Sequence, residues 1–260
     1  MTFFHAIILG IVEGITEFLP VSSTAHLEFA AKLLGIVETD AVKTFLIVIQ
    51  LGAILAVVIL FAPKFIRSWK TYVQVAYSFI PTAIIGFLLY KFIKTMLIGN
   101  TFIAAGALIL GGIIFIFIER KLAKEKKVPP VTTLNTLGPQ RLVGIGLAQA
   151  LAVVPGVSRS GAIIIYGLAS GISREVIVEF AFLLAIPTMI AASGYDLLKT
   201  HAILTAHDWG MIAVGLIVSC LVALVVIKWF IKYIQNHSFE VFGWYRIGVG
   251  ILLLAYSFFG

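Results

Sequence analysis

Two glutamates four residues apart lie in an apolar stretch near the start of the sequence. On a helix, Glu13 and Glu17 would project from the same face, with their Cβ atoms about 5–6 Å apart. Carboxylates this close in a low dielectric repel each other, so one keeps a proton or a cation sits between them. The pair therefore indicates general acid–base chemistry or a site for Mg²⁺ or Ca²⁺. The alternative, a solvated helix face, is uncommon inside an apolar segment.

A cluster of hydroxyl groups and a histidine follows the glutamates. Pro20 predicts the end of the first helix, and Ser22, Ser23 and Thr24 are N-cap candidates for a second helix. Their hydroxyls and the free N–H groups of that helix start suit the binding of an anion. His26 falls on the first turn of the second helix, where it could share a proton with Ser23. The alternatives are hydroxyls that only cap the helix and a histidine that is structural.

A second polar loop interrupts an apolar region in the other half of the sequence. The run Val154–Gly161 reads Val-Pro-Gly-Val-Ser-Arg-Ser-Gly and again opens a helical segment. Arg159, between Ser158 and Ser160, carries a planar guanidinium that suits bidentate binding of phosphate oxygens. The alternative is an arginine that pairs with one of the glutamates for structure alone. Acids, hydroxyls and an arginine together predict a site for a polyanion with an acid or base beside it.

Three other residues lie within apolar stretches. Gln50 either faces the predicted site or makes a helix–helix hydrogen bond. Arg246 is expected to form an ion pair at a helix end. Cys220 is the single cysteine, so the sequence excludes an intrachain disulfide and a thiolate metal site.

The composition indicates a membrane protein. Of 260 residues, 61% are hydrophobic and 12% charged, and the apolar residues collect in long stretches. The net charge of +7 could suggest nucleic acid, but the basic residues lie in short loops between apolar segments, where they report membrane orientation. The sequence therefore argues against both a soluble protein and nucleic-acid binding.

The hydrophobic pattern predicts an all-α polytopic membrane protein. Six stretches approach the roughly 20 apolar residues that a spanning helix needs. They are Phe45–Ala62, Tyr72–Tyr90, Thr101–Ile118, Val176–Gly194, Trp209–Phe230 and Val241–Phe259. Two further apolar regions, Phe3–Gly35 and Leu142–Gly171, are broken by polar residues into arms too short to cross. We interpret these two regions as re-entrant helix–loop–helix hairpins, the first hairpin and the second hairpin, which point to a site inside protein.

The two hairpins resemble each other, which predicts an internal repeat in one membrane domain, residues 1–260. The match places Gly10 on Gly146, Glu13 on Gln149, Pro20 on Gly156, Ser22 on Ser158 and Thr24 on Ser160. Each half then contains a hairpin and three spanning helices, repeat one at about 1–125 and repeat two at about 136–260. Because three crossings are an odd number, the repeats are expected to be inverted and the hairpin tips to meet.

The distribution of lysine and arginine predicts the orientation. Most of these residues fall on the side that holds the linker around Glu119–Arg141. By the positive-inside rule this side is cytoplasmic, which places both termini and the mouth of the first hairpin on the outer face.

The two polar motifs also carry a family resemblance. The run Glu13-Gly-Ile-Thr-Glu-Phe-Leu-Pro-Val-Ser-Ser-Thr-Ala-His26 and the run Pro155-Gly-Val-Ser-Arg-Ser-Gly161 resemble the signatures of the undecaprenyl-diphosphate phosphatase family, the bacitracin-resistance type. Further similarity at Lys43–Gly52 and Phe182–Pro187 extends the match over nearly the whole chain. The resemblance implies dephosphorylation of undecaprenyl diphosphate at the outer face of the bacterial cytoplasmic membrane. That reaction recycles the lipid carrier of peptidoglycan synthesis, and a divalent cation is implied as a helper.

The resemblance also assigns roles to residues. Its acidic pair falls on Glu13 and Glu17, its histidine on His26 and its arginine on Arg159. The implied hydroxyl cluster is Ser22, Ser23 and Thr24. This chain has Leu46 where many members have glutamate, and Ala25 where glycine is usual. Leu46 removes any role for that family carboxylate.

Several alternatives stay open at this stage. The attacking group could be Ser23, water or His26, with a diphosphate clamped by Arg159 and hairpin N–H groups. The expected catalytic set is Glu13, Glu17, Ser23, His26 and Arg159, with Glu13 and Glu17 as metal ligands. The expected substrate-binding set is Ser22, Thr24, Ser158, Arg159, Ser160 and Gln50. A lipid flippase and a membrane scaffold are the rival functions, and we allow for a homodimer.

Overall fold

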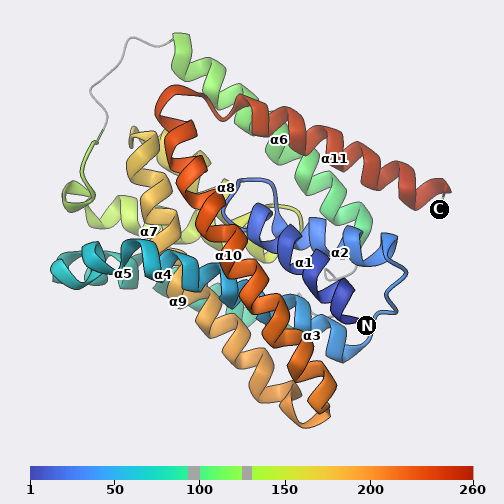
Figure 1. Ribbon diagram of the computed structural model, residues 1–260. Coiled ribbons are helices and arrows are strands. Elements are labelled where there is room, and N and C mark those ends of the chain that lie inside the picture. Colours follow the sequence, from blue (N-terminus) through green and yellow to red (C-terminus); the bar gives the residue numbers. More distant parts are fainter. Residues whose placement is uncertain (93–99, 125–130, 260) are drawn as a thin grey trace.

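The computed structural model describes residues 1–92, 100–124 and 131–259, and this part of the chain is built from α-helices joined by short turns (Figure 1). The α-helices in chain order are α1 (Phe3–Thr16), α2 (Ser23–Leu33), α3 (Asp40–Val48), α4 (Gln50–Arg67), α5 (Trp69–Phe92), α6 (Thr101–Lys124), α7 (Pro139–Ala150), α8 (Arg159–Ala169), α9 (Arg174–Thr200), α10 (Ala206–Asn236) and α11 (Glu240–Phe259). Within the described ranges, extended pairing is limited to one isolated bridge, between Val131 and Ile172. The predicted all-α class is confirmed.

All six predicted spans are long apolar helical segments. They cover Asp40–Ala62, Trp69–Leu89, Thr101–Lys124, Arg174–Ile203, Ala206–Asn236 and Glu240–Phe258. The first differs from its prediction, because the chain turns at Ile49 and divides the segment into α3 and α4. The chain is therefore a multi-pass membrane protein.

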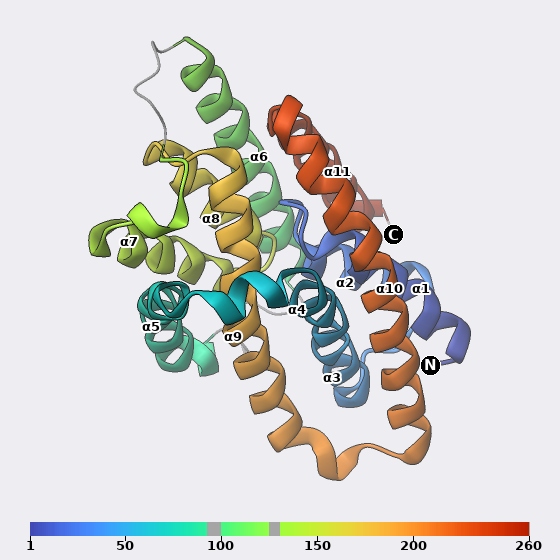
Figure 2. The ribbon, with the colours of Figure 1, turned by 60° about the vertical axis from the view of Figure 1, so that its left-hand side comes forward.

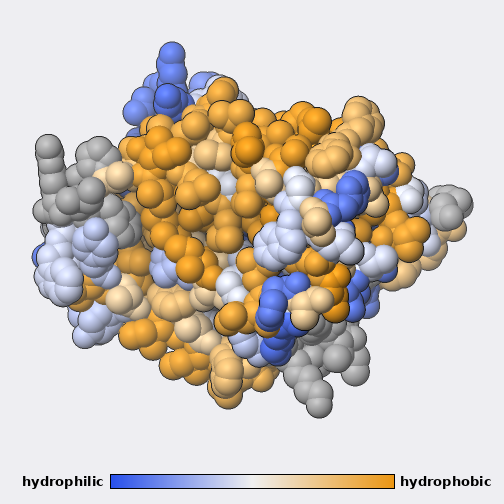
Figure 3. Space-filling model, turned by 60° about the horizontal axis from the view of Figure 1, so that its bottom comes forward, coloured by the Kyte–Doolittle hydropathy of each residue, from blue (hydrophilic) through white to orange (hydrophobic). Residues whose placement is uncertain are grey.

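Exposed apolar side chains cover the surface of these helices. Figure 3 shows one face of the molecule on which orange, apolar residues form most of the surface and blue, polar groups gather in a few places. Leu221, Val225 and Phe117 are among the exposed residues, at 59%, 69% and 66%. Such a surface is suited to lipid rather than to water.

The arms of both hairpins are short helices. In the first hairpin, α1 of 14 residues leads through a turn at residues 17–22 into α2 of 11 residues. In the second, α7 of 12 residues leads through residues 151–158 into α8 of 11 residues. At about 1.5 Å per residue, none of these arms is long enough to cross a bilayer. The lengths agree with the predicted re-entrant hairpins.

Each hairpin packs against the other half of the chain. Helix α1 lies along α10, and α7 lies along α5 (Figure 2). Helix α6 lies along α11, and α4 contacts α9. Interchanging the two predicted repeats turns the α1–α10 pair into the α7–α5 pair. The α6–α11 and α4–α9 pairs each turn into themselves. The packing is of the kind that a two-fold repeat requires, and the repeat boundaries themselves stay a prediction.

Side chains on α5 hold the second hairpin by its backbone. The Ser78 hydroxyl donates to the Leu142 carbonyl oxygen across 2.8 Å, and the Thr82 hydroxyl donates to the Gly146 carbonyl oxygen across 2.8 Å. The first hairpin is held by aromatic packing, where Phe18 meets Phe182 of α9 with ring centroids 5.0 Å apart. The first arm of the second hairpin is thereby fixed on α5, and the tip of the first hairpin on α9.

Candidate active site

The turn of each hairpin contains one serine with a strained backbone. Ser22 has a φ of 71° and Ser158 a φ of 69°, and among the described residues these are the only positive φ values outside glycine. The two serines occupy equivalent positions in the predicted repeat. Non-glycine residues in this region cost about 1–3 kcal/mol each and are concentrated at functional sites. The structure thus places matching backbone strain where α2 and α8 begin.

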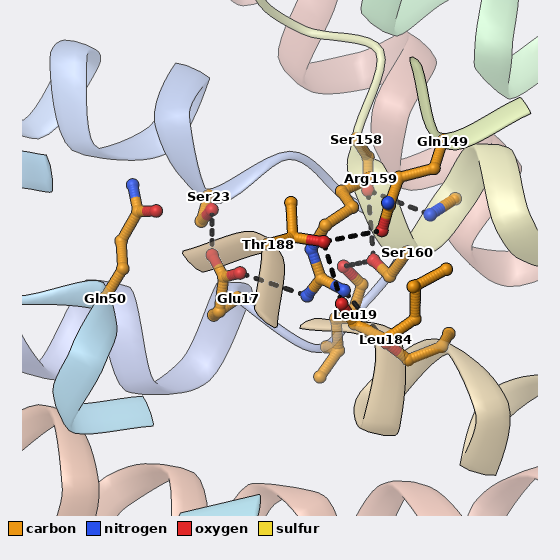
Figure 4. Close-up of polar contacts among 12 residues, drawn as sticks. Glu17, Leu19, Ser23, Gln50, Gln149, Ser158, Arg159, Ser160, Leu184 and Thr188 are labelled. Atoms are coloured by element: carbon orange, nitrogen blue, oxygen red, sulfur yellow. Dashed lines mark hydrogen bonds and ion pairs between the residues drawn. The ribbon is translucent and has the colours of Figure 1, made fainter. Parts of the chain in front are cut away.

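Glu17, Ser23 and Arg159 form a buried hydrogen-bonded group between the two tips (Figure 4). The Ser23 hydroxyl donates to Glu17 Oε2 across 2.6 Å, and Arg159 Nη2 donates to Glu17 Oε1 across 3.2 Å. The side chains of Glu17 and Arg159 are 4% and 7% exposed, so their ion pair is shielded from water. The structure therefore brings together an acid, a hydroxyl and a guanidinium from both hairpins, as the sequence predicted.

Arg159 keeps one donor free. Its Nη1 donates to the Ala181 carbonyl oxygen across 2.9 Å, whereas its Nε is buried and meets no hydrogen-bond partner in the described part of the chain. A buried charged donor without a partner is costly. An anion in the adjacent space would satisfy it.

The serines of the second hairpin are occupied in holding the tips. Ser158 accepts from the Gly161 N–H across 3.1 Å and lies 3.1 Å from the Ser160 hydroxyl. Ser160 donates to the Leu19 carbonyl oxygen of the first hairpin across 3.0 Å. Both serines therefore shape the site, and their role in substrate binding stays a prediction.

Glu13 is fully buried and lacks any neutralising hydrogen bond. No N–H or hydroxyl group among the described residues donates to either carboxylate oxygen, and the group that the carboxyl interacts with most closely is the carboxyl of Glu17. Its repeat equivalent is satisfied: Gln149 donates to Thr82 across 2.8 Å and accepts from Thr188 across 3.4 Å. An unpaired buried acid beside a second acid calls for a proton or a cation.

A small cavity adjoins the buried group. It has a volume of about 80 Å³, which is room for several water molecules. Its walls are formed by Glu17, Ser22, Ser23, Thr24, Gln50, Ala152, Val154, Pro155, Gly156, Ser158, Arg159 and Met189. A larger cavity of about 240 Å³ between α2, α3 and α9 shares Thr24 and Gln50 with it. These two residues thus lie where the polar pocket meets a wider, mainly apolar space.

His26 and Ser23 do not share a proton in this structure. His26 Nδ1 donates to the Ser22 carbonyl oxygen across 2.8 Å, and Nε2 lies 2.9 Å from the Tyr245 hydroxyl of α11. His26 is not in the wall of the cavity. The reason is that each side chain is held by other partners, Ser23 by Glu17 and the His26 ring by the Ser22 carbonyl and Tyr245. Its catalytic role stays a prediction, and the geometry is that of a residue that holds the turn at Ser22.

The environment of Arg246 differs from the one predicted from the sequence. It is fully buried and makes no ion pair within the described residues, so the expected ion pair at a helix end is wrong. Its guanidinium donates instead to carbonyl oxygens, namely those of Pro20, Ala107, Leu108, Gly156 and Val157. A lone arginine in the middle of an apolar span was the signal for this role.

A metal fits the donors of the site only in part. The described residues contain no cluster of three or more His, Cys, Asp or Glu side chains. Glu13 and Glu17 nevertheless supply adjacent carboxylates, and the Glu13 oxygens have no other partner. Hard cations such as Mg²⁺ take only one or two carboxylates when phosphate oxygens and water complete their shell. Glu17 lies in the wall of the cavity and Glu13 does not, so of the two carboxylates only Glu17 is placed to share a cation directly with a phosphate there.

Comparison with known proteins identifies the family of the chain. Residues 6–252 match the family described as bacitracin resistance protein BacA. The chain is similar to the undecaprenyl-diphosphatase of Aquifex aeolicus, at 49% identity over 100% of both chains, and to that of Wolinella succinogenes, at 47% over 98% of both. It is also 47% identical to the undecaprenyl-diphosphatase of Campylobacter fetus, over 98% of this chain and 99% of that one. The chain therefore belongs to the bacitracin resistance protein BacA family.

Proposed function

We propose that this protein is an undecaprenyl-diphosphate phosphatase, which hydrolyses undecaprenyl diphosphate to undecaprenyl phosphate and inorganic phosphate. The observation that carries the proposal is the buried group of Glu17, Ser23 and Arg159 at a cavity between the two hairpins. Family membership and the names of the relatives support it. The reaction would recycle the lipid carrier of peptidoglycan synthesis and so confer bacitracin resistance.

In this proposal Arg159 recognises the diphosphate. Arg159 lies in the wall of the cavity with its Nε unpaired among the described residues, and α2 and α8 both begin at that wall, where helix N-termini offer N–H donors. Phosphate oxygens would replace Glu17 Oε1 as the acceptor of the hydrogen bond from Arg159 Nη2. The carboxylate of Glu17 would then be released to act on the Ser23 proton.

Ser23 is the nucleophile that the geometry favours over water and His26. Its Oγ attacks the terminal phosphorus while its proton passes to Glu17 Oε2, 2.6 Å away. The bond between the terminal phosphorus and the bridging oxygen breaks, and undecaprenyl phosphate leaves. Water then hydrolyses the phosphoserine, which releases inorganic phosphate and restores the hydroxyl.

A Mg²⁺ or Ca²⁺ ion would be held by Glu13 and Glu17. It would neutralise charge on the phosphate oxygens. The Glu13 carboxylate oxygens are buried and receive no hydrogen bond from the described residues, so they are available as ligands for the cation.

The proposed location is the bacterial cytoplasmic membrane, with the site open to the outer face. The excess of lysine and arginine on the opposite side supports this orientation. The polyprenyl tail of the substrate would remain in lipid. A homodimer stays a prediction that chemical cross-linking in membranes would test.

Purified protein incubated with undecaprenyl diphosphate tests the proposal. We expect release of inorganic phosphate that a chelator suppresses and that added Mg²⁺ or Ca²⁺ restores. A protein that releases no phosphate under any metal condition, but moves the lipid between leaflets of vesicles, would instead be the flippase that the paired hairpins also suit.

A further inference from the structure

Arg246 carries a buried positive charge in the middle of α11. Its side chain is fully buried, and in the part of the chain that the structure describes no carboxylate lies within ion-pair distance. A charge in such a place is costly unless hydrogen bonds satisfy it. The guanidinium is satisfied by five carbonyl oxygens from three separate segments.

Two of these carbonyls occupy equivalent positions in the two hairpins. Arg246 Nη1 donates to the Pro20 oxygen across 3.0 Å, and Nη2 donates to the Gly156 oxygen across 3.0 Å. Nη2 also donates to the Val157 oxygen across 3.0 Å. One guanidinium therefore joins the turns of both predicted repeats, although Pro20 and Gly156 lie far apart in the sequence.

The serines with strained backbone lie two residues after the carbonyls of Pro20 and Gly156. Ser22 comes two residues after Pro20, and Ser158 comes two residues after Gly156; both have a positive φ. Strain of this kind persists only when the surrounding structure over-determines the backbone. Arg246 supplies that restraint in both turns at once.

The residues after the strained serines are those of the proposed reaction. Ser23 follows Ser22, and Arg159 follows Ser158, so the direction of each side chain depends on the turn before it. Arg246 itself is not in the wall of the cavity. Its effect on the site would therefore pass through the backbone of the turns.

Helix α6 leaves room for this guanidinium at one glycine. A Cβ atom added to Gly111 would lie 2.2 Å from Arg246 Nη2. The carbonyls of Ala107 and Leu108, one turn earlier, accept from the same guanidinium across 3.2 and 3.4 Å. Gly111 is thus the position from which the guanidinium can be displaced while the arginine is kept.

We propose that Arg246 is a positioning residue that sets the distance between Ser23 and Arg159 by holding both hairpin turns. The inference rests on the proposed phosphatase function and deepens it. It predicts that a change at Arg246 affects phosphate recognition and turnover together, because the two turns supply one group each.

The first test is Arg246→Lys, measured as phosphate release from undecaprenyl diphosphate by purified protein. Lysine keeps the charge but cannot reach carbonyls on three segments together. We expect kcat to fall about tenfold to hundredfold and KM and the inhibition constant of inorganic phosphate to rise severalfold, since small displacements of reacting groups have effects of this size. The matched control is Arg120→Lys at the exposed Arg120–Glu240 pair of the same helix pair, α6 and α11, which should keep wild-type constants.

A purely structural role would give a different result. A destabilised variant loses part of its active molecules, so kcat falls in proportion to the folded fraction while KM and the inhibition constant do not move. That pattern, or wild-type constants in Arg246→Lys, would overturn the proposal.

Gly111→Ala provides the second variant, in case Arg246→Lys does not accumulate in the membrane. It retains the arginine and crowds its Nη2, so the same joint change in kcat and KM is expected in a stably inserted protein. Wild-type kinetics in Gly111→Ala, or failure of both variants to insert, would show that Arg246 serves folding alone. A wild-type enzyme that releases no phosphate would instead reject the proposed function, so the two failures are distinguishable.

Discussion

The Ser23 hydroxyl donates a hydrogen bond to Glu17 Oε2 across 2.6 Å, while Glu17 Oε1 accepts from Arg159 Nη2 across 3.2 Å. One carboxylate therefore connects a potential nucleophile from the first hairpin with the cation of the second. In a buried site, such charge-assisted hydrogen bonds fix both partners.

Removing the Ser23 hydroxyl should abolish turnover. Ser23→Ala deletes the proposed nucleophile, so we expect phosphate release to fall by at least about a thousandfold with normal insertion. Ser257→Ala is the control, because the Ser257 hydroxyl donates only to the Leu253 carbonyl within α11. Radiolabelled substrate quenched in acid should label wild-type protein and leave Ser23→Ala unlabelled. Turnover in Ser23→Ala near the wild-type rate would indicate attack by water.

Replacing Arg159 with lysine should mainly weaken substrate binding. Lysine keeps the charge but loses the planar fork that contacts Ala181, Glu17 and the cavity. We expect KM to rise about tenfold or more, with a smaller effect on kcat. Arg141→Lys, at the start of α7, serves as the matched control. Equal KM values in wild type and Arg159→Lys would contradict phosphate recognition by the guanidinium.

Glu13→Gln should separate stability from activity. The amide removes a buried carboxyl that has no hydrogen-bond partner among the described residues, so we expect the melting temperature in detergent to stay level or rise. Phosphate release should fall and respond more weakly to Mg²⁺ and Ca²⁺, because one carboxylate ligand is lost. A variant with wild-type activity and an unchanged metal response would remove Glu13 from the cation site.

His26 offers a test between a nucleophile and a support for the turn. Its Nδ1 donates to the Ser22 carbonyl oxygen, a bond that an amide side chain can also make. His26→Ala should therefore lose activity, whereas His26→Gln should retain a measurable fraction of it. Complete inactivity in both variants, with normal insertion and stability, would favour the imidazole as a reacting group.

The sequence was sufficient to predict the spans and the meeting of the hairpins. Each span is an apolar stretch long enough to cross hydrocarbon, and the composition of such a stretch is a local property. The sequence predicts Glu17 and Arg159 in one site because each lies in the polar interruption of a hairpin and the two hairpins are equivalent in the repeat. Their ion pair confirms that placement, although 142 residues separate them.

The remaining features depend on tertiary packing that no local pattern carries. The turn at Ile49 interrupts an otherwise continuous apolar run. The direction of His26 follows from its contact with Tyr245, and the partners of Arg246 lie as far as 226 residues away. These contacts arise only when α11 has packed against α6, so that Tyr245 and Arg246 reach the hairpins.

Comparison of wild-type protein with Glu17→Gln tests the central claim most directly. Both are purified in detergent and assayed for inorganic phosphate released from undecaprenyl diphosphate, at equal amounts of folded protein. We predict sustained release by wild type and a decrease of about a hundredfold or more in Glu17→Gln, because the amide cannot accept the Ser23 proton. Equal rates in the two proteins, or no release by wild type, would contradict the account.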